Sequence, residues 1–278
     1  MNHDQVDGVD ETPVGGSLAA RLRTDQPHSA RVWNHLLGGK DNYPVDSETG
    51  DMILRAFPDI AGIARGQRRF LKRAVRYLAA EAGVRQFLDL GTGLPTADNT
   101  HEVAQGVAPG SRIVYVDNDP LVLVHARALL TSTPEGACAY LDADVREPGR
   151  ILEGAARTLD FTRPIGLTML GIMGQLPDED DPASLVAELV AALPPGSYLA
   201  LCDGTDTSET LNAAIAAYNA NSASSYHLRS PERIAAYFDG LDLVEPGVVR
   251  TGEWRPEPDA RDLLLEQGNA VCGVARKP

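Results

Sequence analysis

A turn that contains two glycines is the feature of the sequence that points most directly to chemistry. Gly91 and Gly93, with Thr92 between them, follow the short apolar segment 86–90 and precede a predicted helix. Glycine at such a turn lets the backbone bend sharply and lets a ligand approach main-chain atoms closely. The pattern therefore predicts a binding loop for a nucleotide-type ligand at the carboxyl end of a strand.

Three aspartates follow or end three successive predicted strands and would surround such a ligand. Asp89 stands two positions before Gly91, where a carboxylate opposes a phosphate but suits a ligand with an ammonium group and a sulfonium. Asp117 stands 26 residues after Gly91 and can accept hydrogen bonds from both hydroxyls of a ribose, each worth about 1.5–3 kcal/mol. Asp144 can accept a hydrogen bond from an adenine amino group beside the apolar Val145.

A nicotinamide dinucleotide is the competing ligand for such a loop. A dinucleotide fold has a small residue three positions after the second glycine, and a helix N-terminus free to meet the pyrophosphate. Here Thr96 stands at that position and Pro95 occupies part of the turn. Together with Asp89, these residues disfavour a nicotinamide-dependent oxidoreductase, which remains the less favoured alternative.

The elements that must position these residues alternate between strand and helix from residue 85 onward. This alternation predicts an α/β fold with a doubly wound, mostly parallel, Rossmann-like sheet of seven strands. Strands are predicted over 86–90, 112–116, 139–141, 165–172 and 197–202, with edge strands over 241–244 and 270–274. Helices are predicted over 99–107, 120–130, 150–159, 182–193 and 208–221, and after Ser230-Pro231.

The N-terminal third has a different organisation. Residues 1–27 are polar, acidic and rich in glycine, which predicts a flexible tail. Ser29 can cap a helix over 30–37 that Gly38-Gly39 ends, and Asp46 can cap a second helix towards Phe57. We therefore expect a helical lid over residues 28–82, followed by the sheet domain over residues 83–278.

A third helix in this extension carries a basic stripe, within about 140° of a helical wheel. Its members are Arg65, Arg68, Arg69, Lys72, Arg73 and Arg76. The ordinary interpretation is a face that forms salt bridges with the acidic surface. The functional interpretation is that one or two of these arginines face a carboxylate in a site.

Composition excludes several classes of partner. The chain has 39 acidic and 25 basic residues and a net charge of −14, which argues against a nucleic-acid partner but leaves room for a small anionic one. No segment approaches the length of a membrane span, and residues 1–5 do not resemble a secretory signal. Three widely spaced cysteines favour the reducing cytoplasm, and the six histidines show no metal-ligand spacing, so no metal is expected.

The strand-end residues together resemble the class I S-adenosylmethionine-dependent methyltransferases over about residues 84–205. Nearly the whole chain from residue 28 resembles the uncharacterised bacterial S-adenosyl methyltransferase family. The matching segments are 30–33, 36–43, 86–89, 116–120, 238–241 and 254–256. The resemblance implies a methyltransferase fold and S-adenosyl-L-methionine as the cofactor, but it implies no particular acceptor.

Methyl transfer chiefly requires alignment of donor and acceptor, and it needs a general base only if the nucleophile arrives protonated. The resemblance implies a histidine after the fourth strand, but Gly174 stands there, which puts a base from this loop in doubt. The remaining candidate catalytic residues are Tyr43, His35 and His227. Tyr43 could fold over the donor after the glycine pair or, equally, only pack a loop.

The predicted function is methyl transfer from S-adenosyl-L-methionine to a small-molecule acceptor, because no signature of a nucleic-acid amino methyltransferase follows the fourth strand. The alternative is a cofactor-binding protein without transferase activity. Lys40 or Arg69 could hold the carboxylate of the methionine moiety. The candidate cofactor-binding residues are Asp89, Gly91, Thr92, Gly93, Asp117, Asn118, Asp144, Val145, Leu170, Asn42 and Arg69.

Overall fold

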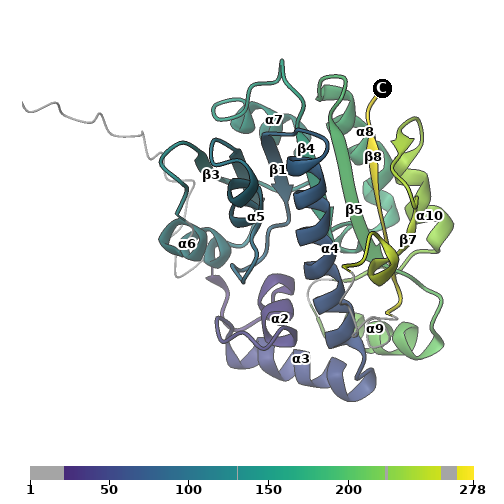
Figure 1. Ribbon diagram of the computed structural model, residues 1–278. Helices are drawn as coiled ribbons and strands as arrows, with labels where there is room; N and C mark the ends of the chain where they lie inside the picture. The colour runs from purple at the N-terminus through teal and green to yellow at the C-terminus, as the bar shows by residue number, and fades with distance from the viewer. Residues whose placement is uncertain (1–21, 130, 223–224, 258–267) are drawn as a thin grey trace, which may run out of the picture.

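A mostly parallel sheet forms the centre of the protein (Figure 1). The computed structural model describes residues 22–129, 131–222, 225–257 and 268–278, so most of the predicted tail, residues 1–21, lies outside the described residues. Within these residues the sheet has eight strands in the order β3-β2-β1-β4-β5-β8-β6, and β7 pairs with β8. The strands are β1 Gln86–Leu90, β2 Arg112–Asp117, β3 Ala137–Asp142, β4 Gly166–Leu170, β5 Tyr198–Gly204, β6 Asp242–Leu243, β7 Val249–Arg250 and β8 Ala270–Arg276.

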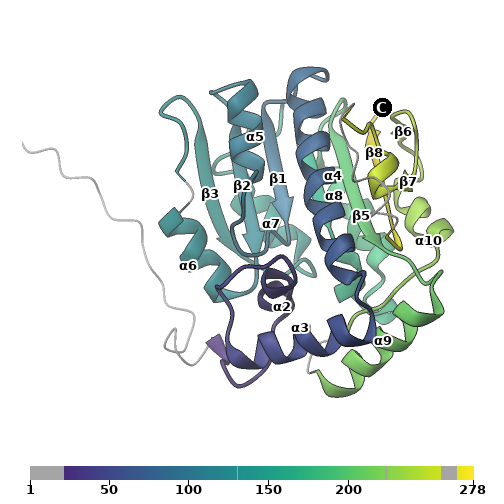
Figure 2. The same cartoon turned by 60° about the horizontal axis from the view of Figure 1, so that its bottom comes forward.

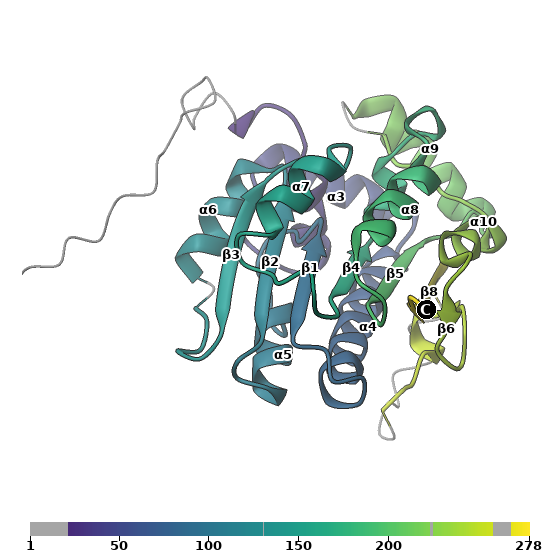
Figure 3. The ribbon, with the colours of Figure 1, turned by 90° about the horizontal axis from the view of Figure 1, so that it is seen from above.

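Helices cover both faces of the sheet (Figure 3). The α-helices are α2 Ser29–Leu36, α3 Pro44–Ala56, α4 Ile60–Ala80, α5 Thr100–Val107, α6 Pro120–Leu129, α7 Pro148–Ala155, α8 Pro182–Ala192, α9 Glu209–Asn221 and α10 Pro231–Ala235. Four short 3-10 helices are η1 Met173–Gln175, η2 Asp178–Asp180, η3 Ala236–Phe238 and η4 Thr251–Glu253. Helices α4, α5 and α6 contribute to one apolar cluster, and α7, α8 and α10 contribute to the other.

The central strands are buried on both faces because their side chains alternate between these two clusters. In β1, Phe87 packs with the α4 side and Leu88 with the α7 side, and in β2, Tyr115 and Val116 do the same. Apolar residues at every position are typical of parallel strands covered by helices on both sides. The five parallel strands end at the same edge of the sheet, so the residues that follow them gather there.

The predicted α/β fold is confirmed, with corrections in detail. The run 270–274 is not an edge strand, because β8 lies between β5 and β6 and also pairs antiparallel with β7, which was not predicted. The helix that carries the basic stripe spans Ile60–Ala80, so the stripe begins after its first turn. His28, and not Ser29, is the N-cap of α2.

Helix α3 also begins earlier than predicted. Proline favours the first position of a helix because its fixed φ is already helical and its missing N–H needs no partner there. Pro44 occupies that position, and Asp46 lies inside the first turn, where its Oδ2 accepts a hydrogen bond from the Tyr43 amide at 2.9 Å. Asp46 therefore caps the helix from within.

Helices α2 and α3 lie across the carboxyl ends of the parallel strands (Figure 2). A buried ion pair attaches α2 to the sheet: Arg31 Nε donates to Asp119 Oδ2 at 2.9 Å, and the two side chains are 3% and 0% exposed. His28 Nδ1 lies 3.1 Å from the same oxygen, and Asp46 Oδ2 lies 3.8 Å from Arg31 Nη1. The N-terminal helices are thus fixed to the end of β2 by charge as well as by apolar packing.

We expect Arg31→Met to lower the free energy of unfolding by about 3–5 kcal/mol, because it leaves Asp119 buried without its partner. Urea-induced unfolding measures the change. The control is Lys72→Met, which breaks an exposed pair with Asp98 whose side chains are 41% and 49% exposed. An exposed pair contributes at most about 1 kcal/mol, so equal losses in the two variants would contradict the importance of the buried pair.

Candidate functional site

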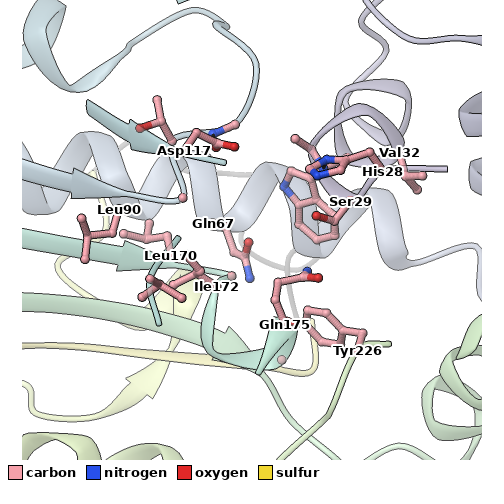
Figure 4. Close-up of a pocket in the computed structure, with 18 of the residues that line it drawn as sticks. His28, Ser29, Val32, Gln67, Leu90, Asp117, Leu170, Ile172, Gln175 and Tyr226 are labelled. Atoms are coloured by element: carbon pink, nitrogen blue, oxygen red, sulfur yellow. Dashed lines mark hydrogen bonds between the residues drawn. The ribbon is translucent and has the colours of Figure 1, made fainter. Parts of the chain in front are cut away.

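A cavity of about 460 Å³ lies between the carboxyl ends of the strands and helices α2, α3, α4 and α9. Its volume is within the range of cavities that bind small molecules. Residues from the ends of β1 and β2, from the segment after β3 and from the loop after β4 line one side (Figure 4). The strand ends predicted to bind a ligand therefore do meet at one cavity.

Asp89 anchors the first strand end. Its carboxylate is buried, with Oδ1 accepting from the Thr168 hydroxyl at 2.8 Å and Oδ2 from the Thr100 hydroxyl at 2.6 Å. Burial raises the pKa of Asp89, and the two hydroxyls and the nearby Arg68 oppose that rise. These bonds join β1, β4 and α5, so the carboxylate is held in one orientation at the cavity wall.

Backbone conformation favours glycine at both positions of the loop, and the space around the residue also does so at one of them. Both have a φ of +67°, a conformation that side chains with a Cβ rarely adopt. A Cβ on Gly91 would also lie 2.6 Å from Ile172 Cδ1, whereas one on Gly93 would meet open space. The Gly93 amide donates to Asp117 Oδ2 at 2.9 Å, so the turn of the backbone is fixed by the second strand end.

Asp117 lies at the cavity wall in a fixed orientation (Figure 4). Its Oδ2 accepts from Gly93 N, and its Oδ1 accepts from Asp119 N at 2.9 Å. Burial raises its pKa, and the two backbone hydrogen bonds oppose the rise. A carboxylate has about four acceptor positions, so each oxygen keeps one for a ligand hydroxyl.

The segment after the third strand closes the same side of the cavity. Asn118 Nδ2 donates to Asp144 Oδ2 at 2.9 Å, which connects this segment to the end of β2. The Arg146 amide donates to Asp144 Oδ1 at 2.9 Å, and its guanidinium reaches Asp180 Oδ2 at 2.5 Å. Val145 adds an apolar surface beside these groups.

Arg68 of the basic stripe lines the cavity, whereas Arg69 and Lys40, the residues predicted to hold the methionine carboxylate, do not. Its Nη2 donates to the carbonyl oxygens of Ala97 at 3.1 Å and Asp98 at 3.3 Å. Its Nε is buried and has no hydrogen-bond partner in the described part of the chain. Burial lowers the pKa of Arg68, and the Asp89 carboxylate is the main opposing charge.

Two other residues of the stripe have contacts away from the cavity. Lys72 pairs with Asp98, as the ordinary interpretation expects, whereas Arg73 donates to backbone carbonyl oxygens, those of Thr251 at 2.5 Å and Trp254 at 2.8 Å. The functional interpretation stays a prediction, and Arg68 is the residue of the stripe placed to fulfil it. A helical wheel identifies a face of the helix, but it does not say which of two adjacent arginines reaches the cavity.

The three candidate catalytic residues and Asn42 do not line the cavity. The Tyr43 ring lies under the Arg31 guanidinium, 5.4 Å from its Cζ. His35 Nε2 lies 2.8 Å from Asp51 Oδ1, and His227 Nε2 lies 2.8 Å from the Ser225 hydroxyl. Asn42 Nδ2 donates to Asn34 Oδ1 at 2.9 Å and to the Gly39 carbonyl oxygen at 3.1 Å. Their catalytic and binding roles stay predictions that the geometry does not support.

Tyr226 occupies the space that a side chain at position 174 would need. A Cβ on Gly174 would lie 2.3 Å from Tyr226 Cζ. The Tyr226 hydroxyl donates to Asp203 Oδ1, and Asp203 Oδ2 accepts from the Gly174 amide at 3.0 Å. Burial raises the pKa of both Tyr226 and Asp203, so the tyrosine keeps its proton at neutral pH. No sequence motif contains Tyr226, and no spacing rule links it to Gly174.

The loop after β4 is held rigidly beside this pair. Arg229, which is buried, donates from Nη1 to the Met173 carbonyl oxygen at 2.7 Å. Its Nη2 donates to the Leu176 carbonyl oxygen at 2.6 Å and to Asp178 Oδ1 at 3.0 Å. The wall of the cavity at residues 173–176 is therefore part of a hydrogen-bonded framework.

A family model described as S-adenosyl methyltransferase matches residues 16–278. The chain belongs to the S-adenosyl methyltransferase family. S-adenosylmethionine is the methyl donor that this membership implies, and the predicted family, cofactor and enzyme class are confirmed. None of the proteins with curated functions matches the chain.

Two solved structures are similar to this member of the S-adenosyl methyltransferase family over nearly its whole length. A DUF574 family protein from Streptomyces avermitilis is 44% identical, with a TM-score of 0.88 over 92% of this chain and 100% of its own. A putative methyltransferase from Thermobifida fusca is 41% identical, with a TM-score of 0.82 over 92% of this chain and 97% of its own. An O-methyltransferase family protein from Burkholderia thailandensis shares the fold, with a TM-score of 0.53 at 14% identity over 94% of this chain and 67% of its own.

None of the helices in the described residues combines the length and the apolar character that crossing a bilayer requires.

We expect Gly174→Ala to lower the free energy of unfolding by about 1–3 kcal/mol, because the added methyl group overlaps the Tyr226 ring. In a Tyr226→Ala background the same change should cost less than about 0.5 kcal/mol, since the space is then free. Thermal or urea unfolding of the four proteins in this cycle gives the coupling energy. An equal cost in both backgrounds would show that the ring does not occupy the space beside residue 174.

Proposed function

We propose that this methyltransferase transfers the methyl group of S-adenosylmethionine to a small-molecule acceptor bound in the same cavity. The observation that carries the proposal is the unpaired, buried Nε of Arg68 beside the strand-end carboxylates. A buried donor without a partner is unfavourable, so it indicates a ligand acceptor atom at that place. The methionine carboxylate of the cofactor is such a group.

The other residues of the strand ends fit the remaining parts of the cofactor. Asp117 would bind the ribose hydroxyls through the acceptor position that each of its oxygens retains. Asp144 and Val145 would contact the adenine, with Asn118 orienting Asp144. Asp89, whose charge is partly balanced by Arg68, would face the ammonium group of the methionine moiety.

Gly91, Thr92, Gly93 and Leu170 complete the proposed cofactor site. All four line the cavity, and the two glycines keep the backbone in a conformation that brings main-chain atoms to its wall. When bound, S-adenosylmethionine supplies a methyl group already activated by the sulfonium. The protein then has to align the acceptor with that methyl group, which can contribute about 7–11 kcal/mol to catalysis.

The cysteines support a cytoplasmic location. Cys138, Cys202 and Cys272 form no disulfide in the described structure. Free thiols, two of them buried here, persist in a reducing compartment.

We expect Asp117→Asn to weaken the binding of S-adenosylhomocysteine by about 10-fold or more, because an amide offers fewer acceptor positions than a carboxylate. Isothermal titration calorimetry measures the affinity. Asp142→Asn is the control, because Asp142 ends β3 at the position that pairs with Asp117 but does not line the cavity. Absence of heat with the unchanged protein at millimolar ligand would overturn the proposed function.

We expect Arg68→Leu to weaken the binding of S-adenosylhomocysteine by about 10-fold or more, because it removes the partner of the methionine carboxylate. Arg69→Leu, the matched change at the neighbouring position, should leave the affinity unchanged. The binding of 5′-methylthioadenosine, which lacks the amino-acid part, should be the same in all three proteins. An equal loss for both ligands would place Arg68 away from the carboxylate.

A further inference from the structure

The cavity has a second part that the proposed cofactor site leaves unused. We call it the apolar chamber and define it by six lining residues from α2, α3, α4 and α9: Val32, Leu36, Ile53, Ile63, Leu211 and Ile215. The first five belong to one buried apolar cluster, and Ile215 packs against it. Helices α2, α3 and α9 and the N-terminal part of α4 lie beyond the carboxyl ends of the strands (Figure 2), and their residues form the roof of the cavity.

Charged side chains are confined to the other part of the lining. Arg68, Asp89, Asp117, Asp144 and Arg146 all belong to the strand ends or face them. Within the described residues, α2, α3, α9 and the segment 225–228 contribute no charged side chain to the lining, apart from the N-cap His28, whose ring faces Asp119. A charged acceptor in the chamber would therefore be buried without a counterion, which is strongly unfavourable.

Several uncharged polar side chains stand at the border of the chamber, among them Gln67, Gln175 and Tyr226 (Figure 4). Gln67 is 4% exposed, and its Nε2 has no hydrogen-bond partner in the described residues beyond the weak interaction of its amide with the Cys202 thiol. Tyr226 directs its proton to Asp203 and its oxygen also faces the Gly204 amide, so one lone pair is left to accept a further hydrogen bond. The border thus offers amide groups, among them the unpaired N–H of Gln67, and a phenolic oxygen to a neutral polar group.

We infer that the methyl acceptor is a neutral, largely apolar small molecule that places one uncharged hydrogen-bonding group at Gln67 and Tyr226. This inference rests on the proposed function, because it assumes that the cofactor fills the strand-end part. It excludes phosphorylated compounds, free amino acids and other charged metabolites as acceptors. It also excludes the small anionic acceptor that the net charge of the chain had left open.

Binding of two matched probes to the full-length protein, saturated with S-adenosylhomocysteine, tests the inference by calorimetry. The probes are 2-naphthol and 2-naphthoate, which share a ring system and differ in charge at neutral pH. We expect saturable binding of 2-naphthol with a dissociation constant at least 10-fold lower than that of 2-naphthoate. Equal or tighter binding of the naphthoate, or no saturable binding of 2-naphthol, would overturn the inference.

A charge placed in the chamber should reverse this preference. Ile215 is half-buried in α9 and lines the cavity, so Ile215→Lys supplies a counterion there. We expect this variant to bind 2-naphthoate more tightly than 2-naphthol. Ala216→Lys, on the exposed face of the same helix, is the control and should keep the original preference. An unchanged preference in Ile215→Lys would place the probe outside the chamber.

The polar border is tested separately. Gln67→Leu should weaken 2-naphthol binding about 5-fold, the effect of one hydrogen bond, while the affinity for S-adenosylhomocysteine stays the same. An unchanged affinity for 2-naphthol would remove Gln67 from the acceptor site. Failure of S-adenosylhomocysteine to bind the unchanged protein is a different result, because it overturns the proposed function itself. Cofactor binding without probe binding overturns only the inference about the acceptor.

Discussion

The buried ion pair between Arg31 and Asp119 determines how the N-terminal helices sit on the sheet. Asp119 belongs to the turn after β2, and its own amide donates to Asp117 Oδ1. One short turn therefore holds the roof through a side chain and orients the proposed ribose-binding carboxylate through a backbone N–H. The position of α2 and the shape of the cofactor site are two consequences of the same local structure, and neither can shift without the other.

Two further buried carboxylates also join separate segments of the chain. Asp89 accepts hydrogen bonds from hydroxyl groups of α5 and β4. Asp203 accepts hydrogen bonds from the Tyr226 hydroxyl, from the Gly174 amide and, at 2.8 Å, from the Gly204 amide. A buried carboxylate is unfavourable unless several donors surround it, so each of these groups draws distant segments to the carboxyl edge of the sheet. This edge is held together by polar contacts, whereas the two faces of the sheet are held by apolar ones.

The pattern of apolar residues and glycine turns along the chain was enough to predict the strands whose position depends on neighbouring residues. The first strand was predicted at 86–90 and lies at Gln86–Leu90, because an apolar run bounded by a glycine turn has few alternatives. The strand-end aspartates follow from the same runs. The place of β8 between β5 and β6 could not be predicted, because antiparallel pairing with a strand far away in the sequence leaves no local trace.

The site shows the same division between local and distant contacts. The choice of Arg68 over Arg69 depends on the rotation of α4 against the sheet, which a helical period alone does not define. The meeting of Tyr226 with Asp203 and the loop after β4 depends on the path of a connection after α9. In each case the missing information is a tertiary contact and not a residue preference.

The contact between Gly174 and Tyr226 also limits which substitutions can occur at these two positions within the family. Two positions that compete for one volume cannot both carry large side chains, so substitutions at them must occur as a pair. A relative with a large side chain at the position of Gly174 should therefore have a small one at the position of Tyr226. The wall of the cavity beside the loop after β4 would then be built from different segments of the chain in different branches of one family.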